Sequence, residues 1–474
     1  MLQPARTAAQ TEAGWEPVFI ERGEVLHRYF SADIIRKSGT YKILHFGDSH
    51  IQADMITGEI RKTLQAETTA GGSGLIFPMS LCGSFGPAGV KSRISGTFSW
   101  STFLKNPEKR PIGICGYEIT LQRGSVLNMD FNESFHGICA KNFSVWIYSE
   151  EDSNHLDSLP RTSFRREKLS PGLYRYHFQS DSVIRSLPLK MRRTCSFWGL
   201  EFHPEEGLVY QQSGLVGAQF LHLASSGSDF FTQLESLKPD LLIFSYGSNE
   251  AYETIDSSRY RKKISAFLET LSRQLPRTGF LLTNAPDTRS GGRTPVSQVA
   301  VNSAIAETAR DLKLPFFDWN RAMGGWGSLY KWEKKQLFLS DLLHFSRKGA
   351  VLTGQLFSFA LLECGRFNEE NQKNLQNRLS VQMSEVLSSE IKSGAEEEES
   401  PAGKPAAKSD VSEARPEKHH AKAVQNAKQR LYEVKQGDNL TLIAQKTRTR
   451  LAVLIRLNQL DSPDKLRIGQ KIRY

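Results

Sequence analysis

Three residues of the chain have types and spacing suited to nucleophilic catalysis. Ser49 stands in the tetrapeptide Gly-Asp-Ser-His, and Asp341 and His344 stand together in Asp-Leu-Leu-His. A serine hydroxyl is a weak nucleophile unless a base accepts its proton and a third group orients that base. The three-residue spacing lets Asp341 and His344 face the same way from a turn. We therefore expect Ser49 to attack an acyl carbonyl, with His344 as the base and Asp341 as its orienting partner.

A carbonyl attacked in this way develops negative charge on its oxygen, which needs hydrogen-bond donors. The amide of Asn249, within Gly-Ser-Asn-Glu, is a suitable donor. Each motif has an ordinary structural explanation when taken alone: Gly-Asp-Ser is usually a turn, Asp341 can cap a helix, and His344 can be a surface histidine. The combination is more specific, because the motifs follow in order and the first two come directly after strand-like runs.

Four short apolar runs provide the elements that must position these residues. They are typical of buried parallel strands, at 42–46, 240–245, 279–283 and 314–318. Helical periodicity recurs between them, for example over 260–275 and 297–312. Strands that alternate with helices of this length predict an α/β fold with a doubly wound sheet. Ligands bind such sheets at the carboxyl ends of the strands, where the motifs emerge.

The stretch between the first two strands differs from the rest of this region. It contains short alternating segments, broken by Gly, Pro, Asn and Asp, at 117–122, 143–148 and 174–178. This pattern predicts an inserted all-β module, in the form of a sandwich. The expected bounds are 1–23 for an N-terminal extension, 24–74 and 207–365 for the α/β domain, and 75–206 for the insert.

The chain changes character again after residue 365. Apolar residues near helical spacing predict a helix within 368–392. The residues that follow are rich in Ala, Lys, Glu, Ser and Pro, with almost no large apolar side chains. We therefore expect 366–429 to comprise a helix and a flexible tether. Residues 430–474 have the pattern of a strand, two short helices and a closing strand.

The motifs resemble the sequence blocks of the SGNH/GDSL hydrolase superfamily, whose fold is a flavodoxin-like doubly wound parallel sheet. The motif around Ser49 resembles the first block, that of Asn249 the third, and Asp341-Leu-Leu-His344 the fifth. The second block supplies an oxyanion-hole glycine and resembles Gly214-Leu-Val-Gly217-Ala. The resemblance implies this role for Gly217, with Gly214 as the alternative, because two glycines leave the register open. It extends over about 24–362, interrupted by the β insert.

Within the superfamily, the chain is most similar to bacterial peptidoglycan O-acetylesterases and related wall-modifying acetyl transfer enzymes. The likeness rests on Gln52, Asp54 and Thr57-Gly-Glu-Ile-Arg61, on a glycine-rich 71–78, and on a β module inserted before the second block. It implies a serine esterase that removes O-acetyl groups from peptidoglycan or a related glycan. The backbone N–H groups of Ser49 and Gly217 and the Asn249 side chain would stabilise the oxyanion.

Three other functions remain open. A sugar O-acetyltransferase would use the same catalytic residues, with a sugar hydroxyl in place of water. A non-catalytic wall-binding protein with a degenerate hydrolase domain is disfavoured by the intact Ser49, Asn249, Asp341 and His344. A short-chain lipase would leave the C-terminal module without an evident purpose.

Residues 432–474 resemble a LysM domain in their βααβ order and in their two Gly-centred turns. The resemblance implies affinity for glycans that contain N-acetylglucosamine. We expect the apolar residues to form the core of the module and its loops to bind the glycan. The predicted glycan-binding residues are Gly437, Asp438, Asn439, Leu440, Thr441, Leu457 and Asn458.

The charge of the chain is concentrated at its C-terminal end. The net charge is +10, and 430–474 hold ten Lys/Arg against four Asp/Glu, which is +6 of the total. Such a surface favours an anionic partner. Nucleic acid ranks below a wall glycan, because no aromatic stacking platform is interleaved with the charge. No apolar run reaches the roughly 18–20 residues of a membrane span.

The remaining composition bears on cofactors, disulfides and location. No cofactor or metal is implied, because the chain has no His/Cys cluster, no GxxxxGK[ST] phosphate loop and no GxGxxG after a strand. Five cysteines without CxxC spacing allow at most two disulfides, and four of them lie within 82–195. The N-terminus lacks the basic start and apolar stretch of a secretory signal. The resemblance nevertheless implies the periplasm or cell envelope.

Overall fold

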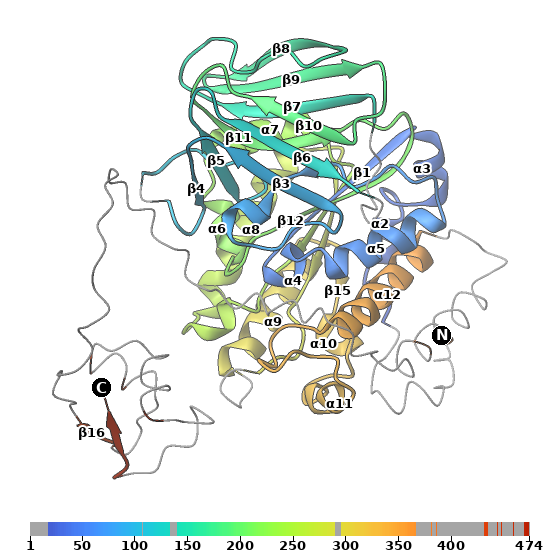
Figure 1. Cartoon of the computed structure of the whole chain (residues 1–474). Helices are drawn as coiled ribbons and strands as arrows, with labels where there is room; N and C mark the ends of the chain where they lie inside the picture. Colours follow the sequence, from blue (N-terminus) through green and yellow to red (C-terminus); the bar gives the residue numbers. More distant parts are fainter. Residues whose placement is uncertain are drawn as a thin grey trace. The chain divides into compact units, whose positions relative to one another are not determined.

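The computed structural model describes residues 18–106, 108–132, 140–289, 295–365, 381, 385, 431–434, 443, 447, 458 and 469–473. The chain divides into two compact units, Met1–Lys404 and Pro405–Tyr474. The first contains the α/β domain and the strands inserted into it, and the second contains the C-terminal module (Figure 1).

The centre of the first unit is a five-stranded sheet. Its order is β12 (Gly207–Gly214), β1 (Thr40–Gly47), β13 (Leu241–Ser245), β14 (Gly279–Thr283) and β15 (Phe316–Phe317). All neighbouring strands run parallel. Numbered in chain order, these strands have the 2-1-3-4-5 arrangement of flavodoxin-like sheets. The predicted doubly wound α/β fold is therefore confirmed.

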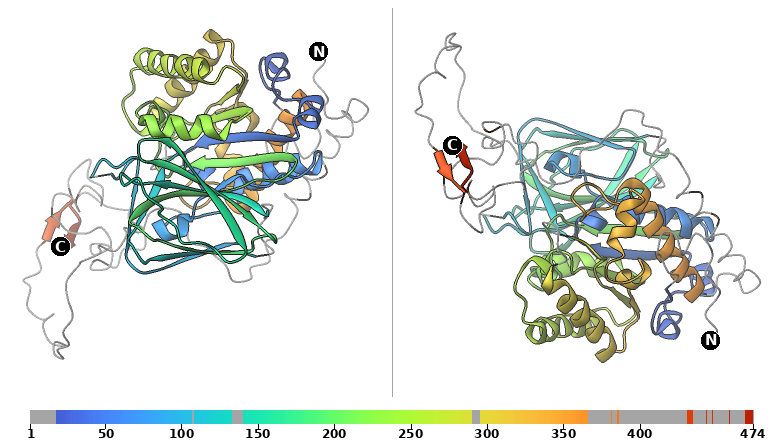
Figure 2. Two further views of the ribbon diagram at one scale, coloured as in Figure 1. Left: turned by 90° about the horizontal axis from the view of Figure 1, so that it is seen from above. Right: turned by 90° about the horizontal axis from the view of Figure 1, so that it is seen from below.

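Alternate side chains of β1, β13, β14 and β15 point into two separate cores, so the sheet is covered on both faces. On β1, Tyr41 and Ile43 lie in one core, and Leu44 and Phe46 lie in the other. The first core is completed by α2 (Gly23–Leu26), α3 (Ala32–Lys37), α5 (Met55–Ala66), α10 (Trp319–Ala322), α11 (Leu329–Lys334) and α12 (Arg347–Cys364). The second is completed by α6 (Phe220–Ala224), α7 (Ser228–Leu237), α8 (Ser257–Gln274) and α9 (Val296–Asp311) (Figure 2). Among the described helices, none is long and apolar enough to cross a membrane.

The sequence missed one strand of this sheet. The strand β12 carries Gln211, Gln212 and Ser213 in its second half, so it lacks the continuous apolar run that marks a buried parallel strand. Its position explains the composition, because β12 is the edge strand of the sheet. The glycine-rich segment runs along its outer side, where the N–H of Gly71 donates to the carbonyl oxygen of Leu208 at 2.9 Å.

The strands between α5 and β12 form two antiparallel sheets. One has the order β10 (Ser186–Lys190), β6 (Val126–Phe131) and β3 (Val90–Ser95). The other has the order β4 (Phe98–Thr102), β5 (Tyr117–Leu121), β11 (Cys195–Phe202), β7 (Asn142–Tyr148), β9 (Leu173–Ser180) and β8 (Thr162–Ser170), and β2 (Leu75–Ile76) also pairs with β11. Apolar side chains of both sheets meet in one core. The prediction of an inserted all-β, sandwich-like module is confirmed.

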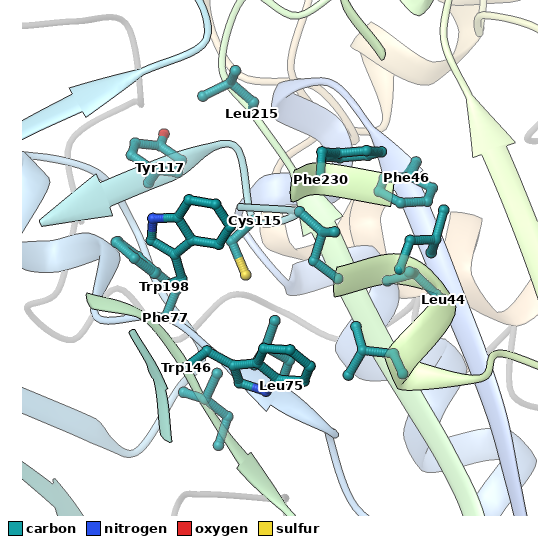
Figure 3. Close-up of a cluster of buried hydrophobic side chains, with 14 of the residues drawn as sticks. Leu44, Phe46, Leu75, Phe77, Cys115, Tyr117, Trp146, Trp198, Leu215 and Phe230 are labelled. Carbon is teal, nitrogen blue, oxygen red and sulfur yellow. The ribbon is translucent and has the colours of Figure 1, made fainter. Parts of the chain in front are cut away.

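The core of the insert is continuous with the core on one face of the central sheet. Trp146 and Trp198 of the insert belong to the same buried cluster as Leu44 and Phe46 of β1 (Figure 3). Separating the two parts would expose this apolar surface to water, which is strongly unfavourable. The insert is therefore held in place against the α/β domain.

A buried ion network reinforces this junction. Glu201 of β11 accepts hydrogen bonds from Lys42 Nζ of β1 at 3.1 Å, from Arg175 Nη2 at 3.1 Å and from Trp146 Nε1 at 3.2 Å. Burial acts to raise the pKa of the Glu201 carboxyl, but the charges of Lys42, His203 and Arg175 outweigh it and lower the pKa. The insert is thus joined to the sheet by charge as well as by apolar packing.

The described cysteines form no disulfide. Cys82, Cys115, Cys195 and Cys364 are not joined by any disulfide bridge, and Cys139 lies outside the described residues. Burial raises the pKa of both Cys115 and Cys195 to about 12. These thiols therefore stay protonated and act as small apolar side chains of the core.

In the second unit, the described residues include an antiparallel strand pair, β16 (Leu431–Glu433) and β17 (Lys471–Arg473). Val434, Ile443 and Ile472 are buried, as expected for the core of the predicted module. Of the predicted glycan-binding residues, only Asn458 is described. Its Nδ2 donates to the carbonyl oxygen of Arg473 at 2.9 Å, and its Oδ1 accepts the N–H of Arg473 at 2.7 Å. The predicted residues Gly437, Asp438, Asn439, Leu440, Thr441 and Leu457, like the predicted helix and tether, lie outside the described residues apart from 381 and 385.

Candidate active site

Ser49 is presented by the tight turn between β1 and α4 (Ser49–Gln52). Asp48 caps the helix, because its Oδ1 accepts the backbone N–H of His50 at 2.9 Å. The end of β12 approaches this turn so closely that a Cβ on Gly214 would lie 2.5 Å from the Cα of Gln52. Ser49 is the first residue of the helix, so its own N–H has no intrahelical partner. The serine therefore combines a hydroxyl and a backbone donor at the carboxyl edge of the sheet.

The three residues predicted to act together are hydrogen-bonded in a row. Ser49 Oγ lies 2.9 Å from Nε2 of His344, and Nδ1 of His344 lies 2.7 Å from Oδ2 of Asp341. The other carboxylate oxygen of Asp341 accepts the N–H groups of Leu343 and His344, each at 3.0 Å. Asp341 thus orients the imidazole and also shapes the loop that carries it.

The electrostatics select one tautomer of His344. Burial acts to raise the pKa of Asp341, but the hydrogen bonds from the His344 ring and from the two backbone N–H groups outweigh it and lower the pKa to about 2. Asp341 is therefore ionised at neutral pH and accepts the Nδ1–H of His344. The lone pair of Nε2 is then directed at the Ser49 hydroxyl, which is the arrangement that a general base needs.

The predicted oxyanion donors lie on adjacent loops. Gly217 follows β12 with a φ of 80°, a conformation that residues with a side chain rarely adopt. Asn249 precedes η2 (Glu250–Tyr252), and its Nδ2 donates to the carbonyl oxygen of Ala218 at 2.8 Å. A side-chain amide has two N–H groups, so one remains for another acceptor. In contrast, the N–H of Gly214 already donates to Oε1 of Gln212 at 2.9 Å.

Glu250 holds these loops together, a role that the sequence did not reveal. Its Oε1 accepts the N–H of Phe220 at 2.8 Å and the hydroxyl of Tyr260 at 2.7 Å, and its Oε2 accepts the N–H of Gly247 at 3.1 Å. Burial raises the pKa of Glu250 to about 7. The carboxyl group therefore links the end of β13 to α6 and α8 beneath Asn249.

His50 is a second residue whose role was missed, although it directly follows Ser49. Its Nδ1 lies 2.9 Å from Oδ1 of Asp48, and its Nε2 lies 2.9 Å from the carbonyl oxygen of Leu343. Burial acts to lower the pKa of His50, but Asp48 and the Leu343 carbonyl outweigh it and raise the pKa. The ring centroid lies 5.5 Å from that of His344. His50 thus connects the turn of the serine to the loop of the histidine.

A cavity opens beside α4. Its lining comes from α4, α5, α10 and α12 and from the loops after β1, β13 and β14, and it includes Asp48, His50, Ser248, Asn284 and Trp319. Within the part of the chain that the structure describes, no group of three His, Cys, Asp or Glu side chains is placed to hold a metal ion. Both ring nitrogens of His50 and the amide of Asn284 already have hydrogen-bond partners within the protein.

Comparison with known proteins gives two family matches. The model of the GDSL-like lipase/acylhydrolase family matches residues 203–352, and that of the LysM domain matches residues 432–473. The first match contains Gly217, Asn249, Asp341 and His344 but not Ser49, which joins them only through the folded structure. No curated protein matches the chain.

The fold also occurs in a solved structure. A peptidoglycan O-acetylesterase superposes with a TM-score of 0.60 at 23% identity, over 71% of this chain and 95% of its own. A lipase/acylhydrolase from Enterococcus faecalis has 20% identity over 32% of this chain and 75% of its own, with a TM-score of 0.27. A TM-score of 0.27 does not establish a shared fold. The chain therefore carries a GDSL-like lipase/acylhydrolase domain and a C-terminal LysM domain.

Proposed function

We propose that this chain is a serine esterase that removes O-acetyl groups from peptidoglycan or a related glycan. The observation that carries the proposal is the hydrogen-bonded row of Ser49, His344 and Asp341, with distances of 2.9 and 2.7 Å. The catalytic domain would comprise 24–74 and 207–365, with the β module 75–206 inserted into it.

The reaction proceeds by acyl transfer in two steps. The Oγ of Ser49 attacks the acetyl carbonyl carbon while Nε2 of His344 takes the hydroxyl proton. The bond between the acetyl carbon and the sugar oxygen then breaks, and His344 returns the proton to that oxygen, which leaves an acetyl group on Ser49. Water attacks this ester, with His344 as base again. Acetate leaves, and the proton returns to Ser49.

Both tetrahedral intermediates place negative charge on the former carbonyl oxygen. The proposed donors are the N–H groups of Ser49 and Gly217 and the second N–H of the Asn249 amide. Preorganised donors of this kind are worth about 2.7–4 kcal/mol each in the transition state. The contact between Asn249 and Ala218 supports this assignment, because it holds the amide against the Gly217 loop.

The LysM domain supports a wall glycan as the substrate. We propose that it binds a glycan containing N-acetylglucosamine and keeps the esterase close to its polymeric substrate, in the periplasm or cell envelope. The shared fold with a peptidoglycan O-acetylesterase points to the same class of ester. The predicted loop residues 437–441 are proposed to contact the glycan.

The proposal is tested by acetate release from O-acetylated peptidoglycan and by hydrolysis of 4-nitrophenyl acetate. Ser49→Ala is expected to abolish both, because it removes the nucleophile. Ser163→Ala, an exposed serine on β8, is the matched control and keeps both. Retained turnover by folded Ser49→Ala protein would refute the assignment. Offering a chitooligosaccharide alongside water separates hydrolysis from acetyl transfer: acetylated oligosaccharide as the main product would identify a transferase.

The anchor is tested by sedimentation with purified peptidoglycan, with and without residues 430–474. The full chain is expected to co-sediment, and the shortened chain to remain largely in solution while keeping its activity on the small ester. Equal binding by both proteins would contradict the proposed role of the LysM domain.

A further inference from the structure

Two aromatic side chains are exposed on the segment that links β15 to α12, at the edge of the sheet that carries the active site. Tyr330 is 51% exposed and Trp326 is 45% exposed. Large apolar groups at a surface often mark a binding site when they lie close together. Trp326 is preceded by Gly325 and followed by Gly327, so its two chain neighbours carry no side chain.

This segment is fastened to the protein by a buried carboxylate. Oδ2 of Asp287, on the loop after β14, accepts the N–H of Gly327 at 2.8 Å and that of Leu329 at 3.1 Å. Asp287 is fully buried, and burial raises its pKa. These bonds hold the backbone between the two aromatic residues. The exposed rings therefore belong to an ordered surface.

Arg289 connects this surface to the catalytic loop. Its N–H donates to the carbonyl oxygen of Leu342 at 3.1 Å, within the Asp341-Leu-Leu-His344 loop. Its guanidinium lies 4.9 Å above the ring of Tyr330. Tyr330 remains 51% exposed beside this contact. An exposed aromatic side chain thus packs against a residue that is hydrogen-bonded to the loop carrying His344.

We propose that Tyr330 and Trp326 form a subsite for the sugar units of the glycan whose acetyl group is bound at Ser49. This inference rests on the proposed function and names where its polymeric substrate lies. Sugar rings present apolar C–H faces that pack on aromatic rings. Trp, Tyr and Arg are also the residue types that contribute most in binding sites. Arg289, which also lies 4.0 Å from the Glu333 carboxylate, packs against Tyr330 and so helps to position its ring.

A glycan fits this surface better than a protein partner does. A stable protein interface buries about 800 Å² on each partner, whereas this surface has two aromatic side chains on one short segment. A sugar strand needs only such a narrow strip, and it must pass close to the catalytic loop for its ester to reach Ser49.

The first test compares two substrates of the full chain. The ratio of kcat/KM for O-acetylated peptidoglycan to kcat/KM for 4-nitrophenyl acetate is expected to fall about tenfold in Tyr330→Ala and in Trp326→Ala. Tyr330→Phe keeps the ring and is expected to keep the ratio. The control is Phe98→Ala, an exposed aromatic residue on β4, which keeps the ratio as well. An unchanged ratio in both alanine variants would overturn the inference.

The second test needs no turnover, so it separates failure of the subsite from failure of the proposed function. The Ser49→Ala chain is oxidised with N-bromosuccinimide in the presence and absence of a chitooligosaccharide, and the oxidised tryptophans are mapped by mass spectrometry. Residues 430–474 contain no tryptophan, so protection by the LysM domain does not interfere. We expect the sugar to slow oxidation of Trp326 about tenfold. Equal oxidation rates would refute the subsite even if the esterase is active.

Discussion

Two regions of the molecule contain a serine, a histidine and an acid hydrogen-bonded in a row. The edge row is Ser49, His344 and Asp341, and the insert row is Ser144, His177 and Glu167. In the insert row, Ser144 Oγ lies 3.1 Å from His177 Nδ1, and His177 Nε2 lies 2.6 Å from Glu167 Oε2. These distances are close to those of the edge row, so residue type and separation alone do not distinguish the two.

The surroundings of the two serines differ. Ser144 lies within β7 and is completely buried, and its hydroxyl also contacts Nε2 of His203 at 2.7 Å. Ser49 begins a helix after a strand end, and its hydroxyl has one histidine partner among the described residues. The row in the insert arises because Ser144 and His177 face each other in register on β7 and β9. Ser49 is itself only 7% exposed, so its position at a helix start, where its backbone N–H has no intrahelical partner, is what distinguishes it from Ser144.

The largest expected effect separates the two serines. Ser49→Ala should lower kcat for a small acetyl ester by about 10⁶-fold, as loss of a nucleophile does in serine hydrolases. Ser144→Ala should keep kcat and lower the free energy of unfolding by about 1 kcal/mol, because it removes a buried hydrogen-bonding hydroxyl. Steady-state kinetics and urea denaturation measure both. A comparable loss of activity in Ser144→Ala would break the distinction.

The second largest effect is expected from substituting the acidic residue of each row. Asp341→Asn is expected to lower kcat by about 10⁴-fold, because the amide no longer selects the required tautomer of His344. Glu167→Gln, on the surface of the insert, is the matched control and should leave kcat unchanged. Circular dichroism checks that both variants are folded. An Asp341→Asn enzyme with nearly normal kcat would show that His344 is oriented by other groups.

The junction between insert and sheet should affect stability more than catalysis. Glu201→Gln leaves Lys42 and Arg175 without their buried countercharge, which is expected to cost about 3 kcal/mol of unfolding free energy. Because Glu201 lies away from the edge row, kcat should persist under conditions where the variant is folded. Denaturation midpoints and kcat at low temperature test this. Unchanged stability would show that apolar packing alone holds the insert.

The smallest expected effect concerns His50, which connects the turn of Ser49 to the loop of His344. His50→Phe removes the bond to the Leu343 carbonyl and the imidazole partner of the buried Asp48 carboxylate, which keeps only the backbone N–H of residue 50. We expect kcat to fall about tenfold, because His344 is then less well positioned. This corresponds to an activation free energy higher by about 1.4 kcal/mol. A kcat equal to that of the native chain would restrict His50 to a structural role.

The pH dependence of stability provides a further readout of His50. The pKa of His50 is raised in the fold from its ordinary 6.5, so its contribution is full below 6.5 and is lost as pH rises through the folded pKa. The pKa of Asp48 is lowered from 3.8, so its contribution is full above 3.8 and is lost as pH falls through the folded pKa. The difference in Tm between the native chain and His50→Phe should therefore be largest between pH 3.8 and 6.5. A difference independent of pH would contradict the ion pair.

Much of the fold and of the site follows from local sequence. The strands β1, β13 and β14 are predictable because each is an apolar run that is buried on both faces. The strand β12 is not, because an edge strand tolerates polar residues. Ser49 and Asn249 are predictable because they directly follow strands. Similarly, the number of disulfides could not be inferred from the sequence. Only the folded chain shows that Cys82, Cys115 and Cys195 are buried and not bridged.

The sequence by itself determined the α/β class, the antiparallel insert, the C-terminal module and the residue types of the edge row, because these depend on periodicity and on short motifs. The tertiary structure decided which residues meet. It brought Ser49 to His344 across 295 positions of the chain. It paired the N–H of Gly214 with the side chain of Gln212 on the same strand. It also placed His50 and Glu250 between the loops of the site. Such contacts depend on strand order and close packing, and no local pattern in the chain encodes them.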